Sequence, residues 1–267
     1  MAKCLVTGGA GFIGSHVATQ LLERGDQVRV LDNLCSGFRT NLAHLGDEIE
    51  FIQGDVVDAA AVREAAKGCE LIFHEAALAS VPASLRDPVG SHAACATGTL
   101  NVLEAARHAG DQPKESKQEA DVLDPLSPYA AFKIASEYYC KSFTKAFGLE
   151  TVCLRYFNVY GPRQDPASEY SAVIPIFVSK MLRGERPTIY GDGLQSRDFV
   201  FVGDVARANL LAGDSAKAVG KSINVGCGRK FTLLELVAAI NALAMCATVW
   251  RISRPRGNCS VIRRNTI

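Results

Sequence analysis

Regularly spaced glycines occur near the start of the chain, in the stretch TGGAGFIGS. Gly8, Gly11 and Gly14 follow the apolar run KCLVT and open the amphipathic run FIGSHVATQLLERG. Glycine lets the backbone turn tightly and approach a pyrophosphate, and the amino end of the following helix offers free N–H groups and a favourable dipole. Asp32 ends the next apolar run, where a carboxylate would accept hydrogen bonds from an adenosine ribose. Together, strand, glycines, helix and acid favour a dinucleotide site over a structural glycine turn followed by an unrelated surface aspartate.

The acid also indicates which dinucleotide would bind. A carboxylate at Asp32 would repel a 2′-phosphate, so NAD is preferred over NADP. Asp55 follows the third apolar run, IEFIQG, and is a candidate adenine contact. A turn or helix-capping aspartate is an equally good interpretation of Asp55.

A second candidate for chemistry is the pair Tyr129 and Lys133 in SPYAAFK. Residues four apart share a helix face, so the lysine ammonium could lie beside the phenol and lower its pKa. Such a phenolate could take a proton from a sugar hydroxyl while hydride leaves for a nicotinamide. Tyr-x-x-x-Lys is common by chance, and a packed aromatic beside a solvated lysine is the alternative. The glycine motif upstream favours the catalytic interpretation.

Alternating apolar runs and amphipathic stretches would position these groups, and this alternation predicts an α/β fold with a parallel sheet. We expect strands at 3–8, 27–33, 49–55, 69–77 and 150–161, and helices at 12–25, 58–68, 87–110 and 129–148. Beyond Pro162 the order loosens into a helix around 174–183, a strand at 197–202 and a helix from Thr232. The sequence thus predicts a Rossmann-like doubly wound domain at 1–160, a smaller and truncated substrate lobe at 161–250 and an atypical tail at 251–267.

Composition excludes several classes of protein. The 267 residues are 48% hydrophobic, enough for a substantial core, and a net charge of +1 provides no global field for nucleic acid or an anionic membrane. Nine cysteines without a C-x-x-C pair indicate reduced thiols in a cytoplasmic protein rather than a disulfide or zinc framework, so no metal site is expected. We expect no signal peptide before the first strand. The late apolar segment 233–250 is interrupted by Glu235 and Asn241, which predicts an amphipathic helix rather than a membrane span.

Several ordered motifs resemble those of the extended short-chain dehydrogenases, specifically the NAD-dependent nucleotide-sugar epimerases. They are TGGAGFIGS, LDNLCSG, GDV, HEAALASVPAS, SPYAAFK, LRYFNVYGPRQDP and IYGDGLQSRDFVFVGDVARANL. The resemblance runs from Met1 to about Asn241 and is strongest to the UDP-glucose and UDP-N-acetylglucosamine 4-epimerases. It implies NAD as cofactor and a UDP-sugar as substrate, although a shared fold does not fix the substrate.

The resemblance assigns roles to matching positions. Tyr129 and Lys133 would be catalytic and would also contact the cofactor. The other NAD-site positions would be Gly8, Gly11, Phe12, Ile13, Gly14, Asp32, Asn33, Ser36, Asp55, Val56, Ala76, Ala77 and Phe157. Asn158 and Arg197 would hold the UDP diphosphate, although Arg197 could instead form a surface ion pair with Asp198. Ser80 and Ser84 would face the sugar, or could cap a loop or helix.

The family reaction implied by the resemblance is reversible oxidation at C4 of the sugar. Tyr129 would remove the hydroxyl proton, the C4 hydride would pass to NAD, and the transient 4-keto sugar would turn before hydride returns to its other face. The long helices at 92–108 and 129–147 match those that pair across a four-helix homodimer interface in the family. Their apolar faces could equally be covered within one chain.

The largest departure from the family lies between His108 and Tyr129. In relatives, the helix ending near Gly110 is followed by a hydrophobic strand and a Ser/Thr-rich turn whose hydroxyl binds the reacting oxygen of the substrate. Here Gly110 runs directly into DQPKESKQEADVLDPLSPY, so about a dozen residues, one interior strand and its turn, are missing. Each buried unsatisfied group left on a neighbouring strand would cost about 1–3 kcal/mol. We expect the sheet to close the gap, recruit another segment or be unstable.

Two smaller departures also bear on activity. Cys95 stands where the family has asparagine, and the tail WRISRPRGNCSVIRRNTI only faintly resembles the family's Arg-Pro-Gly-Asp segment. Three functions therefore remain open. The chain could be a working 4-epimerase in which a serine replaces the lost hydroxyl, an impaired or inactive paralogue that binds NAD or a nucleotide sugar, or a nucleotide-sugar dehydratase or decarboxylase. The candidate replacement serines are Ser80, Ser84, Ser116 and Ser127.

Overall fold

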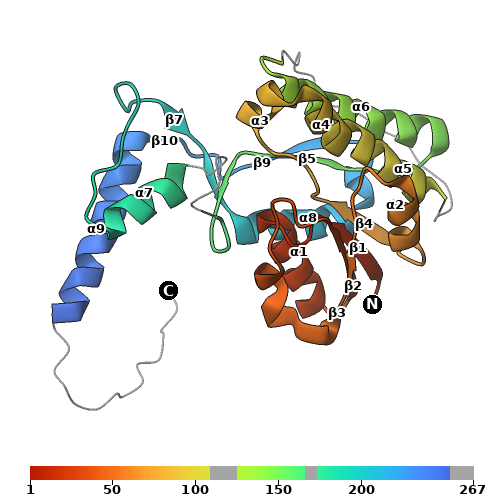
Figure 1. Cartoon of the computed structure of the whole chain (residues 1–267), viewed down its shortest axis with the longest axis horizontal. Coiled ribbons are helices and arrows are strands. Elements are labelled where there is room, and N and C mark those ends of the chain that lie inside the picture. The colour runs from red at the N-terminus through yellow and green to blue at the C-terminus, as the bar shows by residue number, and fades with distance from the viewer. Residues whose placement is uncertain (109–124, 166–172, 253–267) are drawn as a thin grey trace.

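Four parallel strands in the order β3-β2-β1-β4 form the sheet of the first half of the chain (Figure 1). The computed structural model describes residues 1–108, 125–165 and 173–252, the last ten of these by their backbone only. The strands are β1 (Lys3–Thr7), β2 (Gln27–Asp32), β3 (Ile49–Gln53) and β4 (Leu71–His74). In register, Val6 lies beside Val30 on one side and Phe73 on the other. The predicted α/β fold with a parallel sheet is confirmed.

Helices cover both faces of this sheet, which is why β1 and β2 are almost continuously apolar. On one face lie α1 (Phe12–Glu23) and α8 (Val202–Gly213), where Val6 packs with Val17 and Ala206. On the other lie α2 (Ala59–Ala66) and α5 (Gly98–Arg107), where Leu5 packs with Val62 and Val102. Successive strand residues point to opposite faces, so neighbouring residues of β1 belong to two separate cores.

The helix predicted at 87–110 consists of three consecutive pieces. They are α4 (Pro88–His92), a π-helical turn η2 (Ala93–Thr97) and α5. A short helix that the sequence did not predict, α3 (Val81–Arg86), precedes them. The long helix α6 (Pro128–Phe147) begins at its Ser127 cap and ends at Gly148, whose φ of 66° suits glycine.

The single strand predicted at 150–161 is divided at Phe157. The first part, β5 (Cys153–Tyr156), pairs in parallel with β9 (Ser222–Val225), and the second, β6 (Asn158–Tyr160), pairs with β8 (Phe199–Phe201). The chain thus changes partner within two residues. Neither β9 nor α8 was predicted, because both follow the loosely patterned region beyond Pro162.

A cavity of about 1230 Å³ lies between β4 and β5 and is lined by every residue of both strands. Within the described part of the chain, β4 pairs only with β1, and β5 only with β9. Most side chains of β4 and β5 are half-buried, whereas β1 and β2 are buried almost throughout. The cavity therefore occupies the position where the sequence predicts a missing interior strand. Residues 109–124, which hold that departure, lie outside the described residues.

A smaller group of elements lies to one side of the sheet (Figure 1). It contains α7 (Val173–Leu182), β7 (Ser196–Arg197), β10 (Phe231–Thr232) and α9 (Leu233–Ile252), with β7 and β10 antiparallel and α7 packed on α9. Two 3₁₀ segments, η1 (Arg39–Glu48) and η3 (Ala216–Ala218), complete the described elements. The predicted tail beyond Ile252 falls outside the described residues.

Candidate functional site

The glycine turn between β1 and α1 is packed too closely for side chains. Gly8 has a φ of +68°, and a Cβ there would lie 2.6 Å from the backbone nitrogen of Ala76. A Cβ on Gly14 would lie 2.3 Å from the carbonyl oxygen of Gly8. Gly11 caps α1 without a side-chain hydrogen bond, and the first turn holds no acidic residue. The turn therefore offers uncovered helix N–H groups to an anion, which fits a pyrophosphate.

Asp32 holds the turn in place at the carboxyl end of β2. This buried carboxylate accepts hydrogen bonds from the backbone nitrogens of Ala10, at 2.9 Å, and Leu34, at 2.7 Å. A carboxylate has about four acceptor positions, so capacity for a ribose hydroxyl remains. Beside it, the Asn33 amide donates to Asp55 at 2.8 Å, and Asp55 accepts from the Val57 nitrogen at 2.9 Å. Asp55 thus stabilises a turn, which agrees with the interpretation of Asp55 as a turn aspartate. Through Asn33 it also lies next to Asp32, the predicted ligand of the adenosine ribose.

The other predicted cofactor positions lie mainly near the carboxyl ends of these strands. Phe12 and Ile13 start α1, Ser36 is exposed on the loop after β2, and Ala76 and Ala77 follow β4. The carbonyl oxygen of Val56 accepts a hydrogen bond from Asn101 of α5. Phe157 is 47% exposed at the junction of β5 and β6. The structure brings the glycine turn, Asp32 and Ala76 together.

Tyr129 and Lys133 lie one turn apart near the start of α6. The Lys133 ammonium is 5.9 Å from the centre of the Tyr129 ring and forms no hydrogen bond or ion pair with any residue that the structure describes. Burial raises the pKa of Tyr129, and the nearby Cys95 thiol raises it further. The prediction that Lys133 lowers this pKa is therefore wrong for this structure. The ammonium faces the ring, and Lys133 is not among the groups that shift this pKa.

The candidate replacement hydroxyls are already in use where they are described. Ser80 caps α3 by accepting from the Ala83 nitrogen at 2.9 Å, and Ser127 caps α6 by accepting from Ala130 at 3.2 Å. Ser84 donates to the Val81 carbonyl and accepts from the Tyr129 nitrogen at 3.2 Å. Ser116 lies outside the described residues. Ser84 is thus attached to the turn that carries Tyr129, while Ser80 and Ser127 act as helix caps.

The predicted diphosphate ligands occupy neighbouring segments. Asn158 donates its amide to the Asp198 carbonyl at 3.0 Å, whereas Arg197 is exposed and donates to the Ser196 carbonyl. Asp198 accepts from the backbone nitrogens of Cys227 and Gly228. Its carboxylate is therefore occupied by backbone N–H groups rather than by the alternative ion pair with Arg197.

Two titratable residues at the end of β4 were missed by the sequence interpretation. His74 hydrogen bonds to Thr7 and Thr99, and burial together with the Lys133 charge lowers its pKa to about 3. Glu75 accepts from the Tyr156 hydroxyl at 2.8 Å, and burial raises its pKa to about 7 against the opposing effects of Tyr156 and Lys133. An acid directly after the apolar run CELIFH is the signal that could have revealed Glu75.

The cavity between β4 and β5 joins the two halves of the predicted site. Its lining includes Ile13 from the first turn of α1, Tyr129 and Lys133 from α6, Glu75 after β4, and Phe157 after β5. Cofactor and catalytic positions that are more than 100 residues apart in sequence therefore border one space. The cysteines and acids that the structure describes form no group of three that could hold a metal ion. No described helix has both the length and the apolar character of a membrane span.

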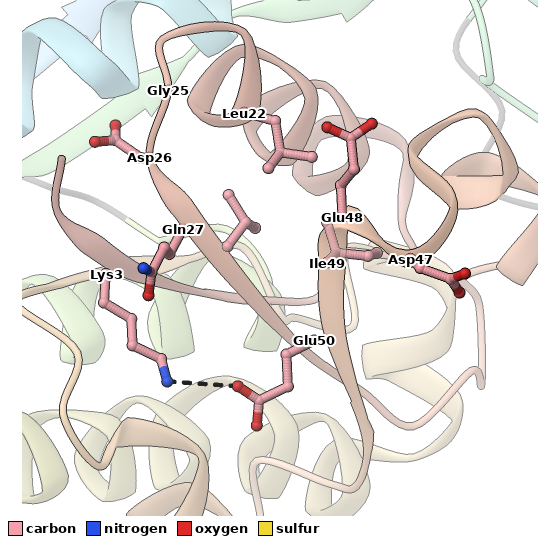
Figure 2. A pocket seen from close by; sticks show the side chains of 10 residues that line it. Lys3, Leu22, Gly25, Asp26, Gln27, Asp47, Glu48, Ile49 and Glu50 are labelled. Atoms are coloured by element: carbon pink, nitrogen blue, oxygen red, sulfur yellow. Dashed lines mark ion pairs between the residues drawn. The ribbon is translucent and has the colours of Figure 1, made fainter.

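A separate cavity of about 580 Å³ lies at the amino ends of β1, β2 and β3 (Figure 2). Figure 2 shows Lys3 directed at Glu50, 3.5 Å away, while the side chains of Asp47 and Glu48 point away from this pair. Four acidic residues line this cavity and would disfavour a diphosphate, and no predicted site residue lines it. The predicted cofactor residues lie at the other end of the sheet, after the carboxyl ends of β1, β2 and β4.

Comparisons with known proteins agree with this arrangement. The sequence pattern described as "NAD dependent epimerase/dehydratase family" matches residues 4–226. A UDP-glucose 4-epimerase from Mycolicibacterium smegmatis is 40% identical over 256 residues, which cover 89% of this chain and 81% of the relative. A UDP-N-acetyl-alpha-D-glucosaminuronate decarboxylase from Bacillus cytotoxicus is 31% identical over 259 residues, covering 90% and 80%.

A solved structure extends the similarity to three dimensions. The UDP-N-acetylglucosamine 4-epimerase from Methanobrevibacter ruminantium, in complex with UDP-N-acetylmuramic acid, superposes with a TM-score of 0.84 at 39% identity. The aligned part covers 91% of this chain and 82% of that structure. The prediction of NAD as cofactor is confirmed at the level of the family. The glycine turn, the α6 pair and the match over most of the chain show that this protein belongs to the NAD-dependent epimerase/dehydratase family.

Proposed function

We propose that the protein is an NAD-dependent 4-epimerase of a UDP-sugar, acting on UDP-glucose and UDP-galactose or on their N-acetylated counterparts. The observation that carries this proposal is the single cavity bordered by Ile13 of the cofactor turn and by Tyr129 and Lys133 of α6. Relatives named as 4-epimerases at about 40% identity support the reaction class. Bound NAD would supply reversible hydride transfer.

The chain's own residues would hold the cofactor and manage the proton. The uncovered amino end of α1 would bind the pyrophosphate, Asp32 the ribose hydroxyls, and the remaining predicted NAD positions the rest of the dinucleotide. Lys133, without an ion-pair partner among the described residues, would donate to the nicotinamide ribose side of the site.

Tyr129 would be the group that accepts the proton of the sugar hydroxyl. Burial raises the pKa of Tyr129, so its hydroxyl is protonated near neutral pH. A nearby positive charge would have to lower this pKa before Tyr129 could accept the proton. Ser84 would help to place Tyr129, since its hydroxyl binds the Tyr129 backbone nitrogen. Asn158 and Arg197 would contact the diphosphate, with Arg197 free to turn because it is exposed.

The test combines cofactor release with product analysis. Purified protein should release a dinucleotide on heat denaturation and should convert UDP-glucose or UDP-N-acetylglucosamine into its C4 epimer. Tyr129→Phe should abolish conversion, whereas Tyr138→Phe is a matched control, because Tyr138 is 61% exposed on the same helix. Full activity of Tyr129→Phe would show that Tyr129 is not the proton acceptor.

A second candidate, an impaired paralogue that binds NAD or a nucleotide sugar, is favoured by the cavity between β4 and β5. The hydroxyls of Ser80 and Ser127 accept hydrogen bonds as helix caps. Neither is therefore free to replace the hydroxyl that the family's missing turn supplies to the substrate. This candidate predicts bound dinucleotide without any C4 inversion. A dehydratase or decarboxylase, as in the Bacillus cytotoxicus relative, would instead release water or carbon dioxide from the sugar nucleotide.

The two-domain division at about residue 160 and a homodimer form part of the same proposal. The helices α5 and α6 pack side by side, and α6 exposes Tyr138 and Tyr139 to solvent. Exposed aromatics on a helix pair suit a symmetric interface. Light scattering of the purified protein should give twice the mass of the chain, and Tyr138→Glu should reduce it to the mass of one chain.

A further inference from the structure

Two cysteine thiols meet at the junction of α6 and β5. Cys140 lies on α6, Cys153 is the first residue of β5, and both are free thiols that line the cavity between β4 and β5. Each thiol is the largest single influence on the pKa of the other, so the two side chains lie next to each other. No step of the proposed epimerase reaction uses this pair.

The surrounding hydrogen bonds hold the two segments together on both sides of the thiols. The Thr151 hydroxyl donates to the Cys140 carbonyl at 3.1 Å and lies 2.7 Å from the Thr144 hydroxyl. One turn before Cys140, Glu137 accepts from the Arg155 guanidinium at 2.8 and 2.9 Å. The thiols are therefore brought together by fixed backbone and side-chain contacts rather than by chance rotation of exposed cysteines.

We propose that Cys140 and Cys153 form a redox-sensitive pair whose reversible disulfide links the helix of Tyr129 and Lys133 to β5. With hydrogen peroxide as oxidant, the Cys140 thiolate attacks one peroxide oxygen and the O–O bond breaks. Cys140 becomes a sulfenic acid, and the hydroxide that leaves takes up a proton, the one that Cys140 lost on ionising, and becomes water. The Cys153 sulfur then attacks the sulfenic sulfur, the S–S bond forms and the sulfenic oxygen leaves as water. Two electrons pass from the two sulfurs to the peroxide, and a dithiol reductant reverses the change.

The electrostatics of the pair support Cys140 as the attacking thiol. The contact with Cys153 lowers the pKa of Cys140, whereas the same contact and burial raise the pKa of Cys153. Burial also raises the pKa of Cys69, and that of Cys4 to about 11, so these thiols are poorer nucleophiles. Cys35 and Cys227 are exposed, and neither has a described thiol partner.

The consequence would be local to the cavity. Cys140 shares a helix face with Lys133 and Glu137, both of which also line the cavity. A bond to Cys153 would fix this wall of the cavity against β5. A disulfide stabilises a protein mainly by restricting its unfolded chain, and the effect is smaller for a short loop such as the one between these cysteines. The oxidised protein should therefore melt only a few degrees higher than the reduced protein.

The test is peptide mapping of the folded full-length protein. After brief hydrogen peroxide treatment and alkylation, trypsin should yield 134–141 joined to 146–155, each of which holds one cysteine. Dithiothreitol should release both peptides. Alkylation of both cysteines after peroxide treatment, or equal linkage of Cys140 to several other cysteines, would overturn the proposal.

Variants provide an independent measurement. Cys153→Ser should leave a sulfenic acid on Cys140 that a dimedone probe captures, and should remove the rise in melting temperature on oxidation. Cys227→Ser, a substitution of an exposed thiol, should change neither result. If Cys153→Ser keeps the oxidation-dependent rise while remaining folded by circular dichroism, the disulfide is not between these two residues.

Discussion

Replacing Glu75 with glutamine tests the most perturbed acid beside the cavity. Glu75 follows β4, accepts a hydrogen bond from the Tyr156 hydroxyl and has its pKa raised by burial to about 7. Glutamine keeps the size of the side chain and an oxygen that can accept from Tyr156, but it cannot ionise. The substitution therefore removes only the cost of a charged group at this position.

The sign and size of the effect follow from the two pKa values. In the unfolded chain the carboxyl titrates near its ordinary value of 4.5, and in the folded protein near 7. Between these values the folded protein binds more protons, so the free energy of unfolding decreases as pH rises and the loss is complete above about pH 7. At about 1.4 kcal/mol per pKa unit the difference corresponds to at most about 3 kcal/mol, because Glu75 is only partly buried.

Chemical denaturation of both proteins between pH 5 and 8.5 measures the effect. Glu75→Gln should be within about 1 kcal/mol of the wild type at pH 5 and about 2–3 kcal/mol more stable at pH 8.5. His74 acts in the opposite direction: it stays neutral in the folded protein down to about pH 3, so its contribution to stability decreases as pH falls from 6.5 toward 3 and the unfolded chain gains a proton. His74 is present in both proteins, so this effect cancels. Glu48→Gln, at an exposed position, should show no such trend. A stability difference that is independent of pH would refute the reasoning.

Three further substitutions probe the rest of the site. Burial raises the pKa of Glu137, but hydrogen bonds from Arg155, Lys141 and Ser222 outweigh this effect and lower the pKa to about 2. Glu137→Gln should therefore lower the free energy of unfolding, measured in urea, by about 3 kcal/mol at pH 7. The difference in stability between the two proteins should disappear as pH falls from 4.5 toward 2. Gly14→Ala should lose the dinucleotide that co-purifies with the protein, measured by absorbance, because the new Cβ would meet the Gly8 carbonyl oxygen. Gly213→Ala is the control and should retain the dinucleotide, because the nearest atom to its new Cβ, in the Phe73 ring, is 3.4 Å away. Cys95→Ser should move the acidic limb of the kcat–pH profile downward, since the Cys95 thiol raises the pKa of Tyr129; an unchanged limb would contradict that assignment.

The parts of the site built from local patterns could be predicted from sequence. The glycine turn, Asp32 and the α1 start depend on residues that are neighbours along the chain or end adjacent strands, so periodicity and glycine spacing were sufficient. The first four strands fall within the predicted ranges for the same reason.

The parts that depend on distant pairing could not be predicted. The pairing of β5 with β9 joins residues about 70 positions apart, and nothing in the run SINV alone indicates its partner. The pKa of Tyr129 was predicted in the wrong direction because helix spacing gives the position of Lys133 but not the degree of burial. Ser80 was ambiguous from sequence because a serine before a helix has the same local pattern whether it caps the helix or binds a ligand. Ser127 was predicted only as a replacement hydroxyl, and the same local pattern makes it a cap of α6.

The most direct test of the central claim uses UDP-glucose that carries deuterium at C4. Incubated with the purified protein and its bound cofactor, it should yield UDP-galactose that retains the deuterium, because the hydride returns from the same cofactor without exchange with water. Tyr129→Phe should slow this conversion by at least about 100-fold. Bound NAD with no inversion at C4 of either UDP-glucose or UDP-N-acetylglucosamine, in a protein that is folded by circular dichroism, would contradict the proposed epimerase function.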